Sequence, residues 1–164
     1  MNYPRGMISR TAEYAVRAMA ALRESPGGRT GTATLSRTVG VPANYLSKIL
    51  HALGRAGLVE ATRGPGGGFR LSRPANRISA YEVVCLFDDV EGQRRCFLGN
   101  RTCNAANACG AHRSWSRVWD GYELFLKEMT LDRLTPPAET RKITRARRPV
   151  RCTRTRTTKS RGAG

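Results

Sequence analysis

The sequence has no run of about eighteen consecutive apolar residues, the length at which a helix can span a bilayer. It has no export signal either, because Glu13, Arg17 and Arg23 interrupt the apolar residues near the N-terminus. It contains no nucleophile–base pair and no paired carboxylates in a catalytic motif, so no enzyme class finds support. We therefore expect a cytoplasmic protein that does not enter the membrane and is not an enzyme.

Acidic side chains are scarce. Twelve Asp and Glu stand against 29 Lys and Arg, which gives a net charge of +17. Such an excess is typical of proteins that bind a polyanion, most often nucleic acid, and here we expect double-stranded DNA. Residues 141–164 hold ten of the basic residues and no acid, which leaves 19 − 12 = +7 for residues 1–140.

The basic tail, residues 136–164, has few apolar residues, and these do not recur at helix or strand spacing. It is therefore predicted to be disordered from Pro136 and Pro137 onward. It is either an arm that binds DNA of any sequence or a solvated extension without a role. Cys152 lies among its arginines, and we interpret this residue as an incidental exposed thiol.

Three helices are predicted in the first 55 residues. Apolar residues recur at helical spacing over residues 8–22. A short helix is expected over residues 33–39, with Thr32 as its cap, and a third over residues 43–55. A tight turn that contains glycine joins the last two. This combination predicts a helix-turn-helix.

A β-hairpin is expected next. Residues 58–62 and 69–71 have the composition of short strands, and the segment Arg-Gly-Pro-Gly-Gly-Gly between them is a loop tip. The segment lacks the Gly-Lys-Ser/Thr ending of a phosphate-binding loop. A helix-turn-helix followed by a hairpin is the arrangement of a winged helix, in which the hairpin is the wing.

This arrangement predicts which residues meet DNA. Residues near the start of a recognition helix reach base edges in the major groove, where Asn can pair with adenine and Lys with guanine. An arginine at the wing can enter a narrow minor groove, and glycines beside it let the backbone approach closely. The alternative is an exposed helix face without a role. The candidate DNA-binding residues are Asn44, Ser47, Lys48, His51, Arg55, Arg63, Gly64 and Gly66.

Two further helices are predicted, over residues 79–88 and from His112 to about Leu131. Ser79 would cap the first, and Cys85 lies in its apolar run as a small core residue. The second carries an apolar stripe that is broad for a small domain to cover, so we favour a dimer interface over packing within one chain. The stripe consists of Trp115, Val118, Trp119, Tyr122, Phe125, Leu126 and Met129.

Three of the five cysteines, Cys96, Cys103 and Cys109, crowd into the predicted loop over residues 92–111. An odd number of cysteines without an export signal argues against a disulfide framework. Thiolates bind iron–sulfur clusters, zinc and copper(I), and the paired C-x₂₋₄-C spacing of zinc sites does not occur here. A cluster is favoured, with a zinc site or redox-active thiols as the alternatives. A cluster requires four protein ligands, so one more must come from elsewhere.

Several short motifs occur in a fixed order. They are Glu13-Tyr14-Ala15-Val16-Arg17-Ala18-Met19, Asn44-Tyr45-Leu46, Arg63-Gly64-Pro65-Gly66-Gly67-Gly68-Phe69, the three cysteines with His112, and Met129-Thr130-Leu131. With these motifs the chain resembles the bacterial iron–sulfur cluster-binding winged-helix regulators of the IscR, NsrR and RirA group, over about residues 7–134. The resemblance implies a homodimeric transcription factor with a cluster near the dimer helix.

The resemblance also implies two candidates for the fourth ligand. His112 matches a ligand of the cluster-assembly regulators, whose [2Fe–2S] cluster has three Cys and one His, so [2Fe–2S] is favoured over [4Fe–4S]. Glu13 stands where some relatives use a carboxylate from the partner subunit. Without a ligand role, His112 would be a helix-capping or surface residue, and Glu13 a solvated acid.

The expected fold is mainly α with a small β-wing: a winged helix-turn-helix over residues 1–76, a cluster-binding loop and a long dimerisation helix over residues 77–135, and the disordered basic tail. The expected function is regulation of transcription in response to iron–sulfur, redox or nitric oxide status through a cysteine-ligated cluster. The alternatives are the same regulator without a cluster, with redox thiols or zinc, and a nucleic-acid-binding structural protein dominated by its tail.

Overall fold

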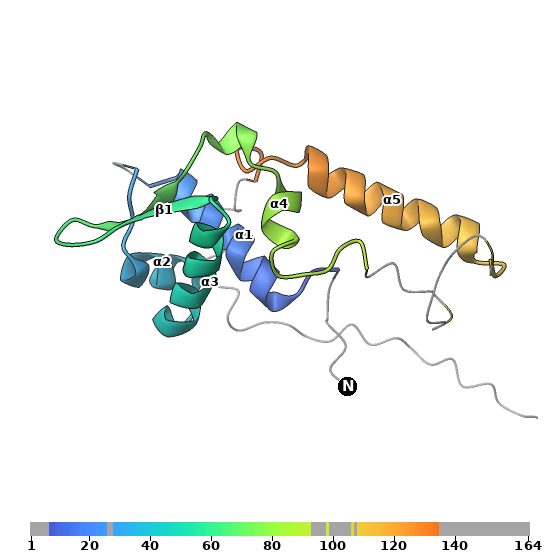
Figure 1. The fold of residues 1–164 in the computed structure, drawn as a ribbon, viewed down its shortest axis with the longest axis horizontal. Helices are drawn as coiled ribbons and strands as arrows, with labels where there is room; N and C mark the ends of the chain where they lie inside the picture. The colour runs from blue at the N-terminus through green and yellow to red at the C-terminus, as the bar shows by residue number, and fades with distance from the viewer. Residues whose placement is uncertain (1–6, 26–27, 93–97, 99–105, 107, 135–164) are drawn as a thin grey trace, which may run out of the picture.

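The structure is a computed structural model that describes residues 7–25, 28–92, 98, 106 and 108–134. Within these residues the expected fold class is confirmed, because helices dominate and the sheet has two antiparallel strands. Cys96, Cys103, Cys152 and the basic tail lie outside the described residues. The elements in chain order are α1 (Arg10–Arg23), α2 (Thr32–Val39), α3 (Ala43–Arg55), β1 (Val59–Thr62), β2 (Gly68–Leu71), η1 (Ala75–Arg77), α4 (Ala80–Val84) and α5 (His112–Glu128) (Figure 1).

The helix-turn-helix is formed by α2 and α3. The α3 helix has the predicted bounds, and α2 begins one residue earlier than predicted. The prediction that Thr32 caps α2 is wrong, because Gly31 occupies the cap position without a side-chain hydrogen bond. The reason is that Thr30 pairs with Phe69 as an isolated bridge, so the extended backbone runs up to Gly31 and the helix starts directly after it.

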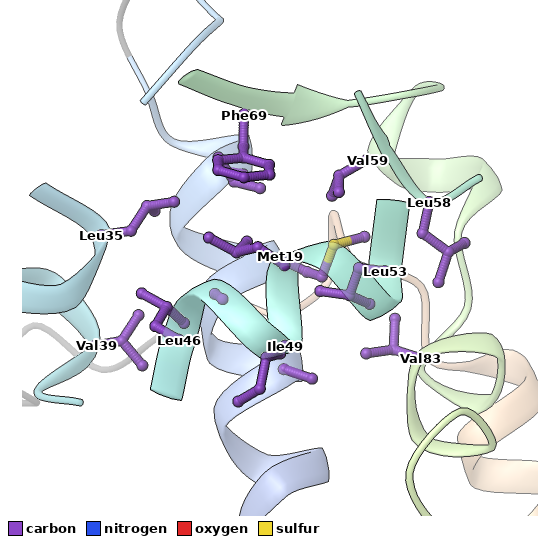
Figure 2. Packing of buried hydrophobic residues seen from close by; sticks show 14 of the residues in the cluster. Met19, Leu35, Val39, Leu46, Ile49, Leu53, Leu58, Val59, Phe69 and Val83 are labelled. Atoms are coloured by element: carbon purple, nitrogen blue, oxygen red, sulfur yellow. The ribbon is translucent and has the colours of Figure 1, made fainter. Parts of the chain in front are cut away.

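The main hydrophobic core lies between α1, α2, α3 and the wing (Figure 2). The α3 helix contributes the predicted stripe of Leu46, Ile49, Leu50 and Leu53, all of them buried. Phe69 reaches this core from β2. Fully burying an aliphatic or aromatic side chain of this size contributes about 1.5–3 kcal/mol, so the buried stripe fixes the rotation of α3 and turns its polar side outward.

The wing is a hairpin in which Val59 pairs with Leu71 and Thr62 with Gly68. Glu60 and Arg70 face each other across the strands and form an ion pair of 2.6 Å. The closing turn requires glycine, because a Cβ at Gly67 would lie 2.3 Å from the carbonyl oxygen of Thr62. The hairpin extends from one side of the molecule (Figure 1).

The α4 helix covers residues 80–84, less than the predicted 79–88. Its predicted cap is confirmed, since Ser79 and Glu82 form a reciprocal capping box. The prediction that Cys85 is a core residue is wrong, because its side chain is exposed. The helix ends at Val84, and the chain then turns so that Val90, instead of Cys85, continues the buried surface.

The α5 helix projects from the body of the molecule, on the side away from the wing (Figure 1). Its C-terminal end is anchored, because Leu126 is buried and Leu131, just after the helix, is buried in the main core. Arg23 on α1 donates to the carbonyl oxygens of Leu131 and Asp132, at 3.1 and 2.7 Å. The main core thus combines residues from the winged-helix segment with residues 78, 83 and 131. Among the described helices, none has the length and apolar character needed to cross a membrane.

Candidate nucleic-acid interface and metal centre

The outward face of α3 carries the five candidate DNA-binding residues predicted on this helix. Their side chains are exposed, except for the half-buried Ser47. No acidic residue occurs anywhere in α3, so its outward face presents only neutral and basic groups. This face can donate and accept hydrogen bonds at base edges without repelling the DNA backbone. The residues brought together are Asn44, Ser47, Lys48, His51 and Arg55.

His51 has a second contact that its position in the helix did not predict. Its ring meets the edge of the Phe69 ring, with 6.2 Å between the centroids and an interplanar angle of 84°. Because Phe69 belongs to β2 and also enters the main core, His51 connects the recognition helix to the base of the wing. This contact, together with the shared core, joins the two elements that carry the candidate DNA-binding residues.

The wing loop holds the other three candidates, Arg63, Gly64 and Gly66, all exposed. Gly64 and Gly66 have φ of 96° and 74°, a region of backbone conformation that favours glycine. The loop therefore presents a guanidinium and an uncovered backbone at the tip of the hairpin. These are the groups suited to a phosphate backbone and a minor groove.

Tyr45 is a surface residue that belongs to one of the motifs of the resemblance but was not predicted to bind DNA. Its side chain is 39% exposed in the first turn of α3, beside Asn44. Its hydroxyl lies 2.7 Å from the hydroxyl of Thr11 on α1, and its ring meets the edge of the Tyr14 ring at 6.2 Å. The available signal was a large aromatic residue one position after Asn44, off the apolar stripe of the helix.

Cys109 and His112 lie at the start of α5, and both are half-buried. The backbone amide of His112 donates to the carbonyl oxygen of Cys109 at 2.9 Å, which fixes the two residues within one turn of chain. Thiolate and imidazole are both known ligands of iron–sulfur clusters, so this donor pair fits a cluster. Within the described part of the chain, no three or more Cys, His, Asp or Glu side chains form a metal-binding group.

Glu13 and Cys85 differ from that pair. Glu13 lies in the first turn of α1, 3.8 Å from the guanidinium of Arg17 on the next turn. Partial desolvation raises the pKa of the Cys85 thiol. Cys85 follows α4 directly and is separated in the chain from the three crowded cysteines.

The polar face of α3, the wing and their common core define a winged helix-turn-helix protein of the kind that binds DNA. Over residues 8–137 the chain matches the family model Rrf2, described as iron-dependent transcriptional regulator, and it belongs to the Rrf2 family of DNA-binding transcriptional regulators. The expected resemblance is thereby confirmed, and the relatives are regulators of transcription, not enzymes.

Three relatives illustrate the similarity. The chain is 33% identical over 128 residues to the HTH-type transcriptional regulator IscR of Pectobacterium atrosepticum, covering 77% of each chain. It is similar to the structure of CymR, the global cysteine regulator of B. subtilis, with a TM-score of 0.64 and 25% identity, covering 77% of this chain and 94% of CymR. The structure of IscR from T. potens has the same fold, with a TM-score of 0.61 and 23% identity, covering 77% and 83%.

Proposed function

We propose that this chain is a cytoplasmic, homodimeric regulator that changes its DNA affinity with iron–sulfur, redox or nitric oxide status. A cluster, [2Fe–2S] in preference to [4Fe–4S], would be held by Cys96, Cys103, Cys109 and His112. The observation that carries this proposal is that two residues whose side chains can ligate iron, Cys109 and His112, are half-buried and lie within one turn at the start of α5. When bound, a cluster supplies a centre that can gain or lose an electron.

The DNA-reading role falls to residues 1–76. In this proposal Asn44, Ser47 and Lys48 meet base edges, while His51 and Arg55 extend the same face. Arg63, with Gly64 and Gly66, meets the minor groove or its phosphates. Residues 77–135 hold the cluster and the dimer contact, and the basic tail, residues 136–164, adds affinity that is independent of sequence.

The homodimer would form along α5. Val118 and Phe125 are 51% and 50% exposed and lie on one edge of the helix, seven residues apart. Gly121 lies between them, and a Cβ there would meet nothing within 4 Å, so a second helix could approach the backbone closely. A second copy of α5 would cover these residues, together with the half-buried aromatic side chains of Trp115, Trp119 and Tyr122.

The test of the cluster is anaerobic purification followed by visible and Mössbauer spectroscopy and by iron and sulfide analysis. The Cys109→Ala chain is expected to lose the cluster, as are Cys96→Ala and Cys103→Ala. The matched control is Cys85→Ala, which removes an exposed thiol with a raised pKa and should leave iron and sulfide unchanged. Full cluster content in Cys109→Ala would contradict the proposal.

The fourth ligand is tested by comparing His112→Ala with Glu13→Ala. We expect only the His112 change to alter the absorption spectrum, because a different ligand atom changes the charge-transfer bands of the cluster. A spectrum altered only by Glu13→Ala would assign the ligand to that carboxylate, supplied by a partner subunit.

A regulator that senses through its thiols is the second candidate function. The similarity to the global cysteine regulator CymR favours it over a zinc-containing regulator and over a structural nucleic-acid-binding protein. The same fold could also hold zinc through its cysteines. Neither thiols nor zinc absorb visible light, so a colourless protein that still binds DNA would support this candidate and reject the cluster.

A further inference from the structure

The residues that begin α1 are held by both flanks of the segment that contains Cys96, Cys103 and Cys109. Before the segment, the carboxylate of Asp88 accepts a hydrogen bond from the backbone amide of Ser9 at 2.7 Å. After it, Tyr122 on α5 donates its hydroxyl proton to the carbonyl oxygen of Met7 at 3.2 Å. Asp88 and Tyr122, which lie on opposite sides of the segment in the chain, thus contact the same short stretch ahead of α1.

Asp88 is a buried carboxylate, only 8% exposed. Its partner Ser9 is the N-cap of α1, where the positive end of the helix dipole stabilises a negative charge. Separation of the two residues would leave the buried carboxylate without this part-buried donor, so it is costly. The start of α1 is therefore expected to follow any displacement of residue 88.

The first turn of α1 also contacts the recognition helix. The Thr11 and Tyr45 hydroxyls lie 2.7 Å apart, and the Tyr14 ring supports the Tyr45 ring from its edge. Tyr45 lies in the first turn of α3, the end of a recognition helix that meets base edges. The start of α1 thus contacts Asp88, ahead of the cysteine segment, at Ser9, and the first turn of α3 at Thr11.

Packing supports the same connection. A second, smaller core joins one side of α1 to α4, to Val90 and to α5, through Ala12, Ala80, Val84 and Leu126. The α1 helix also enters the main core, with Ala15, Ala18, Met19 and Leu22, and Val16 packs against both cores. The α1 helix is therefore packed against both cores, and close-packed interiors transmit strain because they compress little.

We propose that the first turn of α1 couples the cysteine segment to the recognition helix, with Asp88 and Thr11 as positioning residues. A displacement of Asp88 moves Ser9, and the same turn moves Tyr45 and the start of α3 through Thr11. This inference rests on the proposed function for the identity of the signal, but its contacts belong to this chain alone and can be tested without a cluster.

The experiment is a double-mutant cycle in DNA affinity. It uses the full chain as purified anaerobically and after chelation, and a duplex that the wild-type chain selects from a random pool. Asp88→Ala removes the acceptor for Ser9, and Tyr45→Phe removes the hydroxyl that contacts Thr11. Both substitutions act through the same turn of α1. The loss of DNA affinity in the double variant should therefore be smaller than the product of the two single losses, by a factor of at least about three.

The control cycle replaces Asp88→Ala with Asp89→Ala. Asp89 is the next residue, also an aspartate, but it is exposed and accepts from the amide of Gly92 within its own loop at 2.8 Å. When Asp89→Ala is combined with Tyr45→Phe, the loss of DNA affinity should equal the product of the two single losses. Asp88→Asn keeps an oxygen that can accept from Ser9 and should restore most of the coupling. Effects that multiply equally in both cycles would overturn the proposal.

A second cycle covers the case in which Asp88→Ala does not fold. Tyr122→Phe removes the donor to Met7 and leaves the ring in place. Tyr81→Phe is its control, because the Tyr81 hydroxyl contacts Glu91 and not α1. Coupling with Tyr45→Phe is expected for Tyr122 alone. A colourless protein that shows this coupling would reject the cluster and support the coupling through α1. A coloured protein without the coupling would support the cluster and reject the coupling through α1.

Discussion

The wing turn illustrates how a single absent side chain determines the shape of a functional loop. A Cβ at Gly67 would lie 2.3 Å from the Thr62 oxygen and 2.8 Å from the Gly64 oxygen, both backbone atoms that cannot rotate away. Gly66, one position earlier, has a φ of 74° but open space where its Cβ would lie. Gly67 is restricted by contact and Gly66 only by backbone conformation.

Gly67→Ala is therefore expected to reshape the wing, whereas Gly66→Ala should cost only the conformational strain of about 1–2 kcal/mol. The affinity for a specific duplex should fall more in Gly67→Ala, because Arg63 would no longer lie at the tip. Binding titrations at one salt concentration, with thermal unfolding as the control for stability, compare the two. Equal losses of affinity would show that the wing turn does not set the position of Arg63.

Single residues are also where prediction from sequence was weakest. The apolar run around Cys85 predicted a buried residue, but α4 ends at Val84 and the next side chain is exposed. Periodicity describes a helix and says nothing about the turn that follows it. The role of His51 against Phe69 was missed because it depends on two residues that only the folded hairpin brings together.

At the scale of elements, α5 carries an apolar stripe that the rest of the described chain covers only in part. Its apolar side is covered at Leu126 and exposed at Val118 and Phe125. Leu124 is 54% exposed as well, but it lies about 100° around the helix from Phe125, away from the predicted stripe. Phe125 and Leu124 offer a matched comparison for the proposed dimer contact.

Phe125→Glu is expected to give monomers, because a charge would enter a contact that should contribute about 1.5–3 kcal/mol for each buried large apolar side chain. Leu124→Glu introduces the same charge on the other side of α5 and should leave the dimer intact. Sedimentation velocity over a range of concentrations distinguishes the two. Dimers of unchanged affinity in Phe125→Glu would place the interface elsewhere.

Elements with a strong local pattern were predicted well. The bounds of α3 follow from its buried stripe of leucines and isoleucine and from Gly57, which adopts a φ of 71° just after the helix. The wing followed from its glycines. The contacts that hold α1 between its neighbours were not predictable, because Ser9 with Asp88 and Arg23 with Leu131 join positions 79 and 108 residues apart.

At the scale of the whole molecule, residues after α5 complete the core of the DNA-binding region. Leu131 is fully buried there. Leu131→Ala is expected to lower the free energy of unfolding by about 2–5 kcal/mol, as large-to-small core changes commonly do. Leu86→Ala, at a 41% exposed position, should cost less than about 1 kcal/mol. Urea unfolding measures both, and a small effect at Leu131 would mean that the segment after α5 is not part of the cooperative unit.

The proposed role of the basic tail concerns the whole complex with DNA. Deleting residues 137–164 should lower the slope of log K against log salt by about 0.9 for each lost phosphate contact, because fewer counterions are released from the DNA. Specific binding should survive the deletion, which would reject a structural nucleic-acid-binding role dominated by the tail. An unchanged slope would show that the tail is a solvated extension.

In the proposed mechanism, a cluster at the start of α5 controls the DNA affinity of the whole dimer. Half-sites on B-DNA lie about 34 Å apart for a dimer of this kind, so a small rotation of α3 changes the register of binding without altering any base contact. The most direct test is the affinity of apo, reduced and oxidised protein for one selected operator at a fixed salt concentration. We predict a difference of about 5- to 150-fold between at least two of the states. Equal affinity in all three would contradict the mechanism and leave a DNA-binding protein that carries a cluster without sensing through it.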